Sequence, residues 1–137
     1  MSEYIKPLPV IQPWTEEFWK AAKKHKLLVQ RCEACDINIF YPRKFCPECW
    51  SGDLNWTEAS GRAKVFSFTV TYTGVESKFA PDLPYVLAWV DLEEEGVRML
   101  TNIVGCDPEE VQIGMDVEVI FEDISPEVSL PKFRPIA

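Results

Sequence analysis

The sequence predicts a mainly β fold that contains one N-terminal helix, a cysteine-bound ribbon and a small antiparallel barrel. Two observations predict it. Two Cys-x-x-Cys pairs lie within residues 31–50, and apolar and polar side chains alternate in short runs after Gly61. The chain has 137 residues, of which 47% are hydrophobic, so it is too apolar for disorder and long enough for a metal-stapled module joined to a barrel. We expect three units, residues 1–29, 30–60 and 61–137.

An extended arm and a helix are expected before the cysteines. Prolines interrupt any regular period in residues 1–13, which are therefore expected to lie extended on the body of the protein. Apolar side chains then recur at steps of three and four, with acidic residues first and lysines later, an order that matches the helix dipole. These positions are Trp14, Phe18, Ala21 or Ala22, and His25, with Thr15 as the expected N-cap.

The expected helix carries more aromatic surface than one narrow stripe needs. Trp14, Phe18 and Trp19 either pack into the core, as aromatic side chains at helical spacing commonly do, or dock on a partner chain. The sequence leaves both interpretations open.

The alternation after Gly61 predicts five strands. In residues 61–74, Phe66, Phe68 and Tyr72 fall on one face, and we expect these aromatic side chains to point into the core. Residues 84–105 hold two runs on either side of an acidic turn that ends in Gly96, which is a hairpin pattern. Residues 114–123 alternate again, and the tail 132–137 is expected to supply a last short strand.

The two cysteine pairs predict a metal site with Cys32, Cys35, Cys46 and Cys49 as ligands. Each pair forms a knuckle that aims two sulfurs at one point, and two knuckles complete a tetrahedral shell. Four thiolates leave no open coordination position, so the metal is expected to be structural, with zinc favoured and iron also compatible. A thioredoxin-like redox pair is the other interpretation, but it needs a βαβ pattern that the sequence lacks.

The N-terminal residues contain no basic stretch followed by an apolar run, and no segment approaches about 18 consecutive apolar residues. We therefore expect a soluble, cytoplasmic protein. In that reducing compartment, paired cysteines more often bind metals or act in redox chemistry than form structural disulfides.

The charge is divided unevenly along the chain. Residues 1–64 have a net charge of +2 and residues 65–137 a net charge of −10. The acidic half would repel a phosphate backbone, so an anionic ligand is expected among the basic side chains of the first half. These are Lys20, Lys23, Lys24, Lys26, Arg31, Arg43 and Lys44. The plainer interpretation, a charged surface that only aids solubility, stays open.

The residues offer little support for independent catalysis. A nucleophile needs a base within hydrogen-bond reach, and His25 is the single histidine of the chain. Cys106 would need His25 folded against it, and is more typical of a small side chain at the turn before Pro108. The acidic clusters lie in expected turns and loops, where carboxylates are ordinarily solvated. We therefore expect no catalytic residues.

The order of these segments resembles the family that joins a rubredoxin-like zinc ribbon to an OB-fold, catalogued as a domain of unknown function. The resemblance spans residues 14–137 and implies that the barrel is an OB-fold. It rests on a basic helix that bears tryptophan, followed by RCEACDINIFYPRKFCPEC, GRAKVFSFTV, PYVLAWVDLEEEG and TNIVGCDPEEVQIGMDVEVIFED. Asp36 departs from the pattern, which commonly has glycine after the first Cys pair, so the first knuckle is expected to differ in backbone shape.

The resemblance implies a non-catalytic, acyl-CoA-associated subunit of a hetero-oligomer. Members work beside thiolase-like enzymes, and in some cases beside hydroxymethylglutaryl-CoA synthase or hotdog-type hydratases, where they bridge subunits and help form a CoA channel. An apolar barrel mouth would then cover the pantetheine or acyl arm. The side chains that would meet the CoA phosphates are Lys20, Lys23, Lys24, Arg43 and Lys44.

Single-stranded nucleic acid is the alternative ligand, since OB-folds and zinc ribbons both bind it. Phe66, Phe68 and Tyr72 would then be stacking platforms. The net charge of −10 on residues 65–137 argues against binding to a backbone of phosphates.

Overall fold

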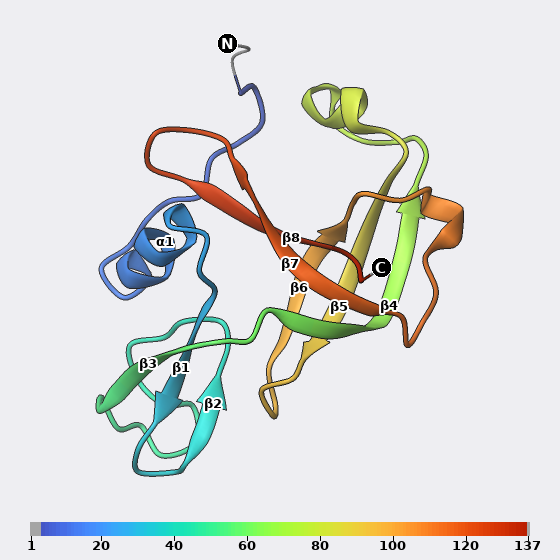
Figure 1. Ribbon diagram of the computed structural model, residues 1–137. Helices are drawn as coiled ribbons and strands as arrows, with labels where there is room; N and C mark the ends of the chain where they lie inside the picture. Colours follow the sequence, from blue (N-terminus) through green and yellow to red (C-terminus); the bar gives the residue numbers. More distant parts are fainter. Residues whose placement is uncertain (1–3, 137) are drawn as a thin grey trace.

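The computed structural model describes residues 4–136, in which an arm and a helix lead into a three-stranded ribbon and a five-stranded barrel (Figure 1). The helix is α1 (Glu16–Lys23), and the ribbon strands are β1 (Leu28–Cys32), β2 (Ile37–Ile39) and β3 (Leu54–Glu58). The barrel strands are β4 (Arg62–Thr71), β5 (Tyr85–Leu92), β6 (Arg98–Ile103), β7 (Asp116–Asp123) and β8 (Ser129–Pro135). Two short 3-10 helices, η1 (Ser77–Asp82) and η2 (Pro108–Glu110), lie in the barrel loops. The predicted mainly β fold is confirmed.

The barrel closes in the strand order β4-β5-β6-β8-β7. Its neighbouring strands are antiparallel except for β6 and β8, which are parallel and share one register pair, Ile103 with Phe133. The last strand begins at Ser129, before the tail that the sequence predicts, and Ala137 lies outside the described residues. Two hydrogen bonds join the strands beside this pair: the Val104 N–H donates to the Phe133 carbonyl at 2.8 Å, and the Thr101 hydroxyl donates to the Pro131 carbonyl at 3.2 Å.

Strand β4 reverses the face that it buries. Val65 is buried, Phe66 is 47% exposed, and Phe68 packs against the core again. The register of β4 against β5 shifts between Val65 and Ser67, which marks a β-bulge. The prediction that Phe66 points inward is therefore wrong, because the bulge breaks the alternation on which it rests. It is also wrong for Tyr72, which follows the last residue of β4 and is 59% exposed.

The helix is shorter than the sequence predicts. It ends at Lys23, and His25 lies beyond it with a positive φ of 62°. Thr15 occupies the N-cap position, but its hydroxyl accepts a hydrogen bond from the backbone N–H of Gln12 at 2.9 Å and makes no capping bond to the helix. No helix within residues 4–136 combines the length and apolar character needed to cross a membrane.

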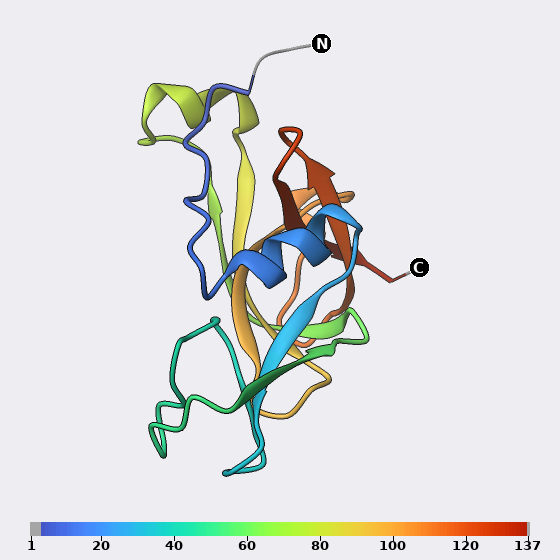
Figure 2. The ribbon, with the colours of Figure 1, turned by 90° about the vertical axis from the view of Figure 1, so that its left-hand side faces the viewer.

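The arm of residues 4–13 contains no helix or strand and runs past the barrel down to α1 (Figure 2). Lys6 Nζ lies 2.5 Å from an Asp82 carboxylate oxygen, which ties the arm to η1. Residues 1–3 of the predicted arm lie outside the described residues.

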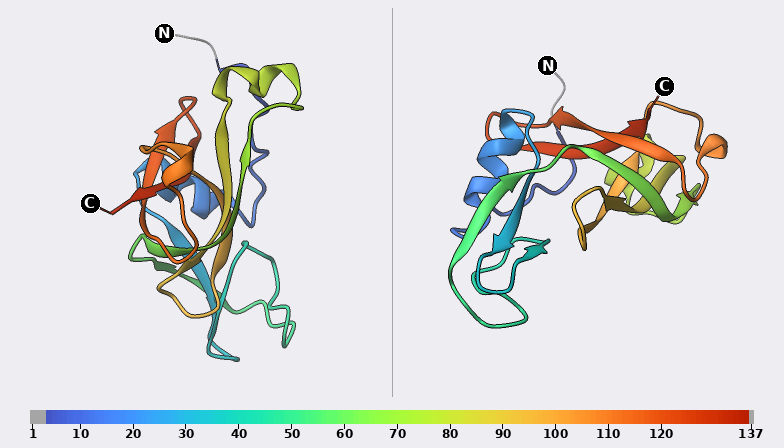
Figure 3. Two further views of the ribbon diagram at one scale, coloured as in Figure 1. Left: turned by 90° about the vertical axis from the view of Figure 1, so that its right-hand side faces the viewer. Right: turned by 60° about the horizontal axis from the view of Figure 1, so that its bottom comes forward.

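One hydrophobic core joins the helix, the base of the ribbon and the barrel. Phe18 of α1, Val29 of β1 and Phe133 of β8 belong to the same buried cluster. The ribbon extends away from this junction (Figure 3), and its distal end has a second small cluster of Cys32, Ile39 and Cys46. The shared core therefore holds α1 and the base of the ribbon in place against the barrel.

Candidate metal centre and adjoining cavity

The four ribbon cysteines converge on one point. Their Sγ atoms all lie within 4.8 Å of one another. Cys32 Sγ lies 3.6 Å from Cys49 Sγ, and Cys46 Sγ lies 3.8 Å from Cys35 Sγ. A tetrahedron of sulfurs with metal–sulfur bonds of about 2.3 Å has edges of about 3.8 Å. The residues present therefore fit a four-coordinate metal, and the donor set leaves no position for a substrate.

The two knuckles have the same backbone shape. Asp36 follows the first Cys pair and Trp50 follows the second, and both are left-handed, with φ of 59° and 64°. Each donates its backbone N–H to the first cysteine carbonyl of its pair, at 2.8 and 2.9 Å. Asp36 thus takes a left-handed conformation, which aspartate adopts more readily than most residues.

Backbone N–H groups also point at the sulfurs. The N–H of Cys35 donates to Cys32 Sγ and the N–H of Glu48 donates to Cys46 Sγ, both at 3.4 Å. Such bonds hold the sulfurs in place and favour their anionic form. The knuckles thus supply both orientation and charge stabilisation for thiolate ligands.

Hydrogen bonds and burial give the Cys35 and Cys46 thiols different pKa values. The neighbouring Cys49 thiol and burial raise the pKa of Cys35 to about 12. Burial also raises the pKa of Cys46, but the backbone N–H groups of Cys49 and Glu48 outweigh it and bring that pKa down to about 7. Because thiolates are the metal ligands, metal binding releases protons and strengthens as the pH rises.

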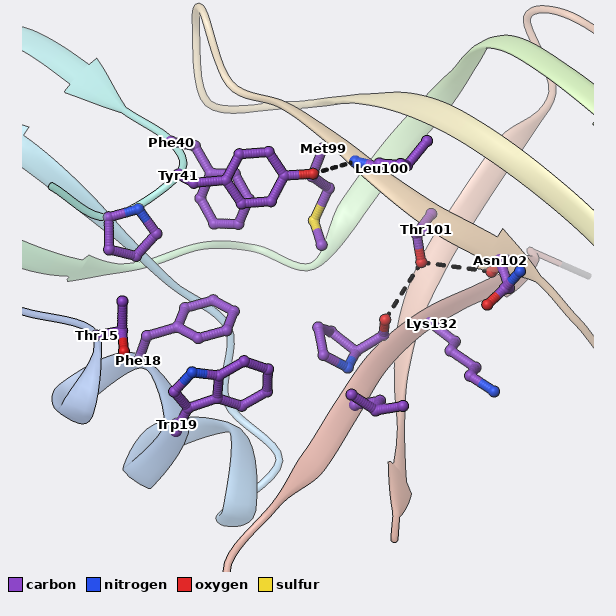
Figure 4. Close-up of a pocket in the computed structure, with 13 residues that line it drawn as sticks. Thr15, Phe18, Trp19, Phe40, Tyr41, Met99, Leu100, Thr101, Asn102 and Lys132 are labelled. Carbon is purple, nitrogen blue, oxygen red and sulfur yellow. Dashed lines mark hydrogen bonds between the residues drawn. The ribbon is translucent and has the colours of Figure 1, made fainter. Parts of the chain in front are cut away.

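An apolar cavity of about 340 Å³ lies where the helix, the ribbon loop and the barrel meet (Figure 4). Its walls come from Phe18 and Trp19 of α1, Phe40 and Tyr41 after β2, and consecutive residues of β6 and β8. The residues that line it include no Asp, Glu, Cys or His. The cavity can therefore hold an apolar or neutral ligand, but it offers no acid–base pair.

The ribbon loop that forms one wall is held by hydrogen bonds at two residues, Tyr41 and Arg43. Gln30 is 4% exposed, and its side-chain amide bonds the backbone of Arg43 on both sides, as donor at 2.9 Å and as acceptor at 2.7 Å. The hydroxyl of Tyr41 accepts the backbone N–H of Leu100 at 2.7 Å. Cys46 follows three residues after Arg43, so the candidate metal site lies at the end of this loop.

Most of the basic side chains predicted to meet phosphates already have partners. Lys20 Nζ lies 2.9 Å from Glu16, and Lys23 Nζ donates to the Ser125 carbonyl at 2.8 Å. Lys44 Nζ lies 4.4 Å from the centre of the Trp14 ring. The side chains of Lys24 and Arg43 have no hydrogen bond or ion pair among the described residues, and both residues are exposed.

The three aromatic side chains of the helix differ in burial. Phe18 is 6% exposed and belongs to the core of the chain itself, where it contacts Trp19 at a ring-centre distance of 5.0 Å. Trp14 and Trp19 are half-buried. Because Phe18 is buried in the core of this chain, the predicted docking on a partner chain now depends on Trp14 and Trp19.

His25 and Cys106, the two residues considered as catalytic candidates, are not among the residues that line this cavity. His25 stacks on Phe121 and its Nε2 lies 3.0 Å from Asp123 Oδ1. Cys106 lines a second cavity of about 450 Å³, with Tyr85 and Pro108 among its neighbours. Burial and the nearby carboxylates of Glu110 and Asp107 raise the pKa of Cys106, which disfavours a nucleophilic thiolate.

Sequence reasoning missed three residues at the cavity, Tyr41, Leu100 and Asn102. Tyr41 lies in the stretch YPRKFCPEC. Its short distance in sequence from the cysteines was the one feature that could have indicated a role at the site. Leu100 and Asn102 looked like ordinary outward positions of a strand. They line the cavity because the ribbon loop with Tyr41 packs against β6, a contact that no local pattern predicts.

Two family models match the chain in succession. The model of the ChsH2 rubredoxin-like zinc ribbon domain matches residues 19–55, and that of the ChsH2 C-terminal OB-fold domain matches residues 56–122. The boundary between them falls within β3, where the ribbon leads into the barrel.

Several known proteins are similar over most of the chain. A probable enoyl-CoA hydratase alpha subunit of Thermomonospora curvata is 38% identical over 96% of this chain, which spans 40% of that relative's length. A DUF35 domain-containing scaffold protein of Methanothermobacter thermautotrophicus is 37% identical over 77% of this chain and 78% of its own. The benzoylsuccinyl-CoA thiolase subunit BbsA of Geobacter metallireducens is 32% identical over 78% and 73%.

A solved structure described as an Ltp2-ChsH2(DUF35) aldolase is also similar. It matches with a TM-score of 0.83 and 38% identity, over 93% of this chain and 98% of the matched chain.

Proposed function

This chain belongs to the DUF35 family of ChsH2-type zinc-ribbon and OB-fold proteins, and we propose that it is an accessory subunit that holds an acyl-CoA for a thiolase-like enzyme. An acyl-CoA hydratase or synthase is the other class of partner, because relatives named as hydratase and thiolase subunits both match it. The chain itself carries out no chemical step in this proposal. It works within a hetero-oligomer.

The observation that carries the proposal is the cavity between the helix, the ribbon and the barrel. An acyl-CoA presents a long, largely apolar arm, and this cavity is lined by Phe18, Trp19, Phe40 and Met99. Its lining contains no carboxylate, thiol or imidazole that would act on a thioester. These features support a holder whose ligand reacts in another subunit.

Zinc bound by Cys32, Cys35, Cys46 and Cys49 is the proposed structural ion. A closed shell of four thiolates is typical of structural zinc, and iron has the same geometry with sulfur ligands. The ion would hold the ribbon loop that ends at Cys46, and with it the wall formed by Phe40 and Tyr41. Metal content would thereby support the shape of the cavity.

The CoA phosphates are proposed to lie near exposed cations of the N-terminal half of the chain. Lys24 and Arg43 are the candidates whose side chains have no hydrogen bond or ion pair among the described residues. Lys20 and Lys23 would first have to leave Glu16 and Ser125. Substitution of Lys24 therefore tests this assignment without breaking another contact of that side chain.

Single-stranded nucleic acid fits the charges less well. Phe66 is exposed, but the guanidinium of Arg98 lies 3.4 Å from the centre of its ring and covers one face. Residues 65–137 carry a net charge of −10, which repels a backbone of phosphates. Stacking of bases on this surface would require Arg98 to leave both Phe66 and Asp91.

Purification of an untagged copy from its native host, followed by mass spectrometry, tests the proposal. We expect a thiolase-like or related acyl-CoA enzyme in stoichiometric amount, and calorimetric binding of a CoA thioester to the complex. The chain alone should turn over no thioester. Thioester turnover that Cys106→Ser abolishes, or binding of single-stranded DNA in place of CoA, would contradict the proposal.

A further inference from the structure

The N-terminal arm forms part of the wall of the second cavity, of about 450 Å³. Strands β5, β6 and β8 and the loop that carries Cys106 contribute most of the lining. Tyr4 and Lys6 of the arm line it as well, together with Phe79 and Asp82 of η1. The arm begins beside η1 and then runs down to α1 (Figure 2). Two segments about 75 residues apart in sequence therefore complete this cavity.

Few contacts hold the arm on the body of the protein. Among the described residues, the hydrogen bonds from residues 4–11 to the rest of the chain come from Lys6 alone, whose Nζ lies 2.5 Å from an Asp82 carboxylate oxygen. Ile5, Leu8 and Val10 are 54%, 51% and 78% exposed, and the described arm residues contribute nothing to the buried core. The position of the arm therefore depends largely on one ion pair.

This ion pair is partly open to solvent. The side chain of Lys6 is 15% exposed and that of Asp82 is 46% exposed, so water and salt reach the carboxylate. An ion pair of this kind shifts an equilibrium by a factor of about five at most, and added salt weakens it. It therefore holds the arm closed without fixing it permanently.

We propose that the arm is a strap that covers the second cavity and is held closed by the ion pair between Lys6 and Asp82. With the pair formed, Tyr4 and Lys6 complete the wall of the cavity. With the pair broken, the arm lifts and the cavity opens to solvent and to small apolar molecules, which suit walls that include Phe79 and Ile103.

The strap acts on one cavity only. Asn102, Leu130 and Lys132 line both cavities, but the arm residues 4–13 line only the second. Movement of the arm therefore changes access to the second cavity and leaves the wall of the first in place. The inference thus goes beyond the proposed function and does not depend on it.

The thiol of Cys106 reports whether the strap is closed. Cys106 is half-buried and lines the second cavity, so N-ethylmaleimide should react with it mainly when the arm has lifted. Trypsin cleaves after lysine and arginine, and the fragment 99–132 contains no other cysteine. Mass spectrometry of this fragment from the full chain therefore gives the alkylation rate of Cys106 separately from the ribbon cysteines.

Lys6→Met removes the cation and keeps a long side chain. We expect it to raise the alkylation rate of Cys106 about two- to fivefold at low salt, the shift that one partly exposed ion pair produces. Loss of a cation by itself disfavours a nearby thiolate and would slow the reaction, so a faster rate reports opening. Added sodium chloride should bring the wild-type rate up toward that of the variant. The charge exchange Lys6→Asp with Asp82→Lys should restore the slow rate.

Lys64→Met is the matched control, because it removes a lysine–aspartate pair of the same length, 2.5 Å to Asp116, outside the second cavity. It should react like wild type, and melting temperatures confirm that all variants fold. Equal rates for wild type and Lys6→Met overturn the inference, as does a wild-type rate equal to that of the chain unfolded in urea. An equal acceleration in Lys64→Met overturns it too, since the effect would then be general destabilisation.

Discussion

The side chain of Gln30 clamps the backbone of Arg43, donating to its carbonyl at 2.9 Å and accepting from its N–H at 2.7 Å. This bidentate contact connects the first ribbon strand to the loop that carries Phe40 and Tyr41 into the cavity wall. Replacement of Gln30 by alanine leaves the N–H and the carbonyl of Arg43 without these partners. We expect Gln30→Ala to lower the free energy of unfolding by about 1–3 kcal/mol and to weaken acyl-CoA binding.

Chemical denaturation and calorimetry measure these two effects. Gln112→Ala, at an exposed position, should change neither. Unchanged ligand affinity in a folded, destabilised Gln30→Ala would show that the loop position does not matter for the cavity.

Loss of one metal ligand should disorder the ribbon. Cys46→Ser is expected to release the ion, because serine does not supply the fourth thiolate, and to reduce acyl-CoA affinity through the loop that ends at Cys46. Elemental analysis gives the metal content, and an absorption spectrum distinguishes iron from colourless zinc. Cys106→Ser should keep the metal, since Cys106 lies on the barrel. A fully ordered ribbon in metal-free Cys46→Ser protein contradicts the structural role.

The contacts of Asp123 predict a dependence of stability on pH. The Ser129 hydroxyl donates to this carboxylate, His25 lies 3.0 Å away, and together they lower the pKa of Asp123 to about 2. Its ordinary value is about 3.9. A lowered pKa in the folded state means that the stabilisation is present above about pH 4 and is lost as the pH falls toward 2.

Urea denaturation at several pH values checks this expectation. Asp123→Asn should be less stable than wild type at pH 6, and the two should converge between pH 4 and pH 2. The comparison cancels the loss of metal in acid, which affects both proteins equally. Asp53→Asn, at an exposed position without such contacts, should follow wild type throughout. A constant difference between Asp123→Asn and wild type at every pH rules out the linkage.

The left-handed conformation of Trp50 predicts an unusual ranking of two variants. Trp50 is 77% exposed and has a φ of 64°, where glycine has no steric cost. Trp50→Gly and Trp50→Ala both remove the indole, so their difference reports the backbone alone. We expect the glycine variant to be more stable by about 1 kcal/mol. At Glu58, an exposed residue of β3, the ranking should reverse. Equal stability of the two Trp50 variants would be inconsistent with this knuckle shape.

Lys24 tests the placement of the CoA phosphates. Lys24→Glu reverses an exposed charge whose side chain has no hydrogen bond or ion pair among the described residues, so it should leave the fold intact. If the helix faces the nucleotide, affinity for 3′,5′-ADP and for hexanoyl-CoA should fall together, most strongly at low salt. Lys78→Glu, on η1, is the control. Parallel binding curves for Lys24→Glu and wild type would remove the helix from the phosphate site.

The sequence predicts those features that local patterns control. The cysteine spacing identifies the sulfur cluster, and period-two alternation identifies the five strands of the barrel. The bulge at Phe66 escapes this reasoning, because one irregular residue changes which face is buried without altering composition. The end of α1 at Lys23 is likewise set by the contacts of His25 with Phe121 and Asp123, which come from β7.

The cavity could not be predicted from the sequence for a related reason. Its lining includes Tyr41 of the ribbon loop and Asn102 of β6, which are 61 residues apart in sequence and come to one cavity because the ribbon packs on the barrel. The resemblance to a family supplied CoA as the ligand, whereas charge alone indicated only an anion. Partnered lysines such as Lys20 and Lys23 show why a count of charges overstates the available phosphate site.

A crystal structure of the native complex with a bound CoA thioester measures the central claim most directly. The account predicts continuous density for the acyl-CoA arm in the cavity between α1, the ribbon loop and the barrel, beside Phe18, Trp19 and Tyr41, with the thioester emerging toward the partner enzyme. Density for CoA confined to the partner, with the space beside Tyr41 filled by water, would contradict it.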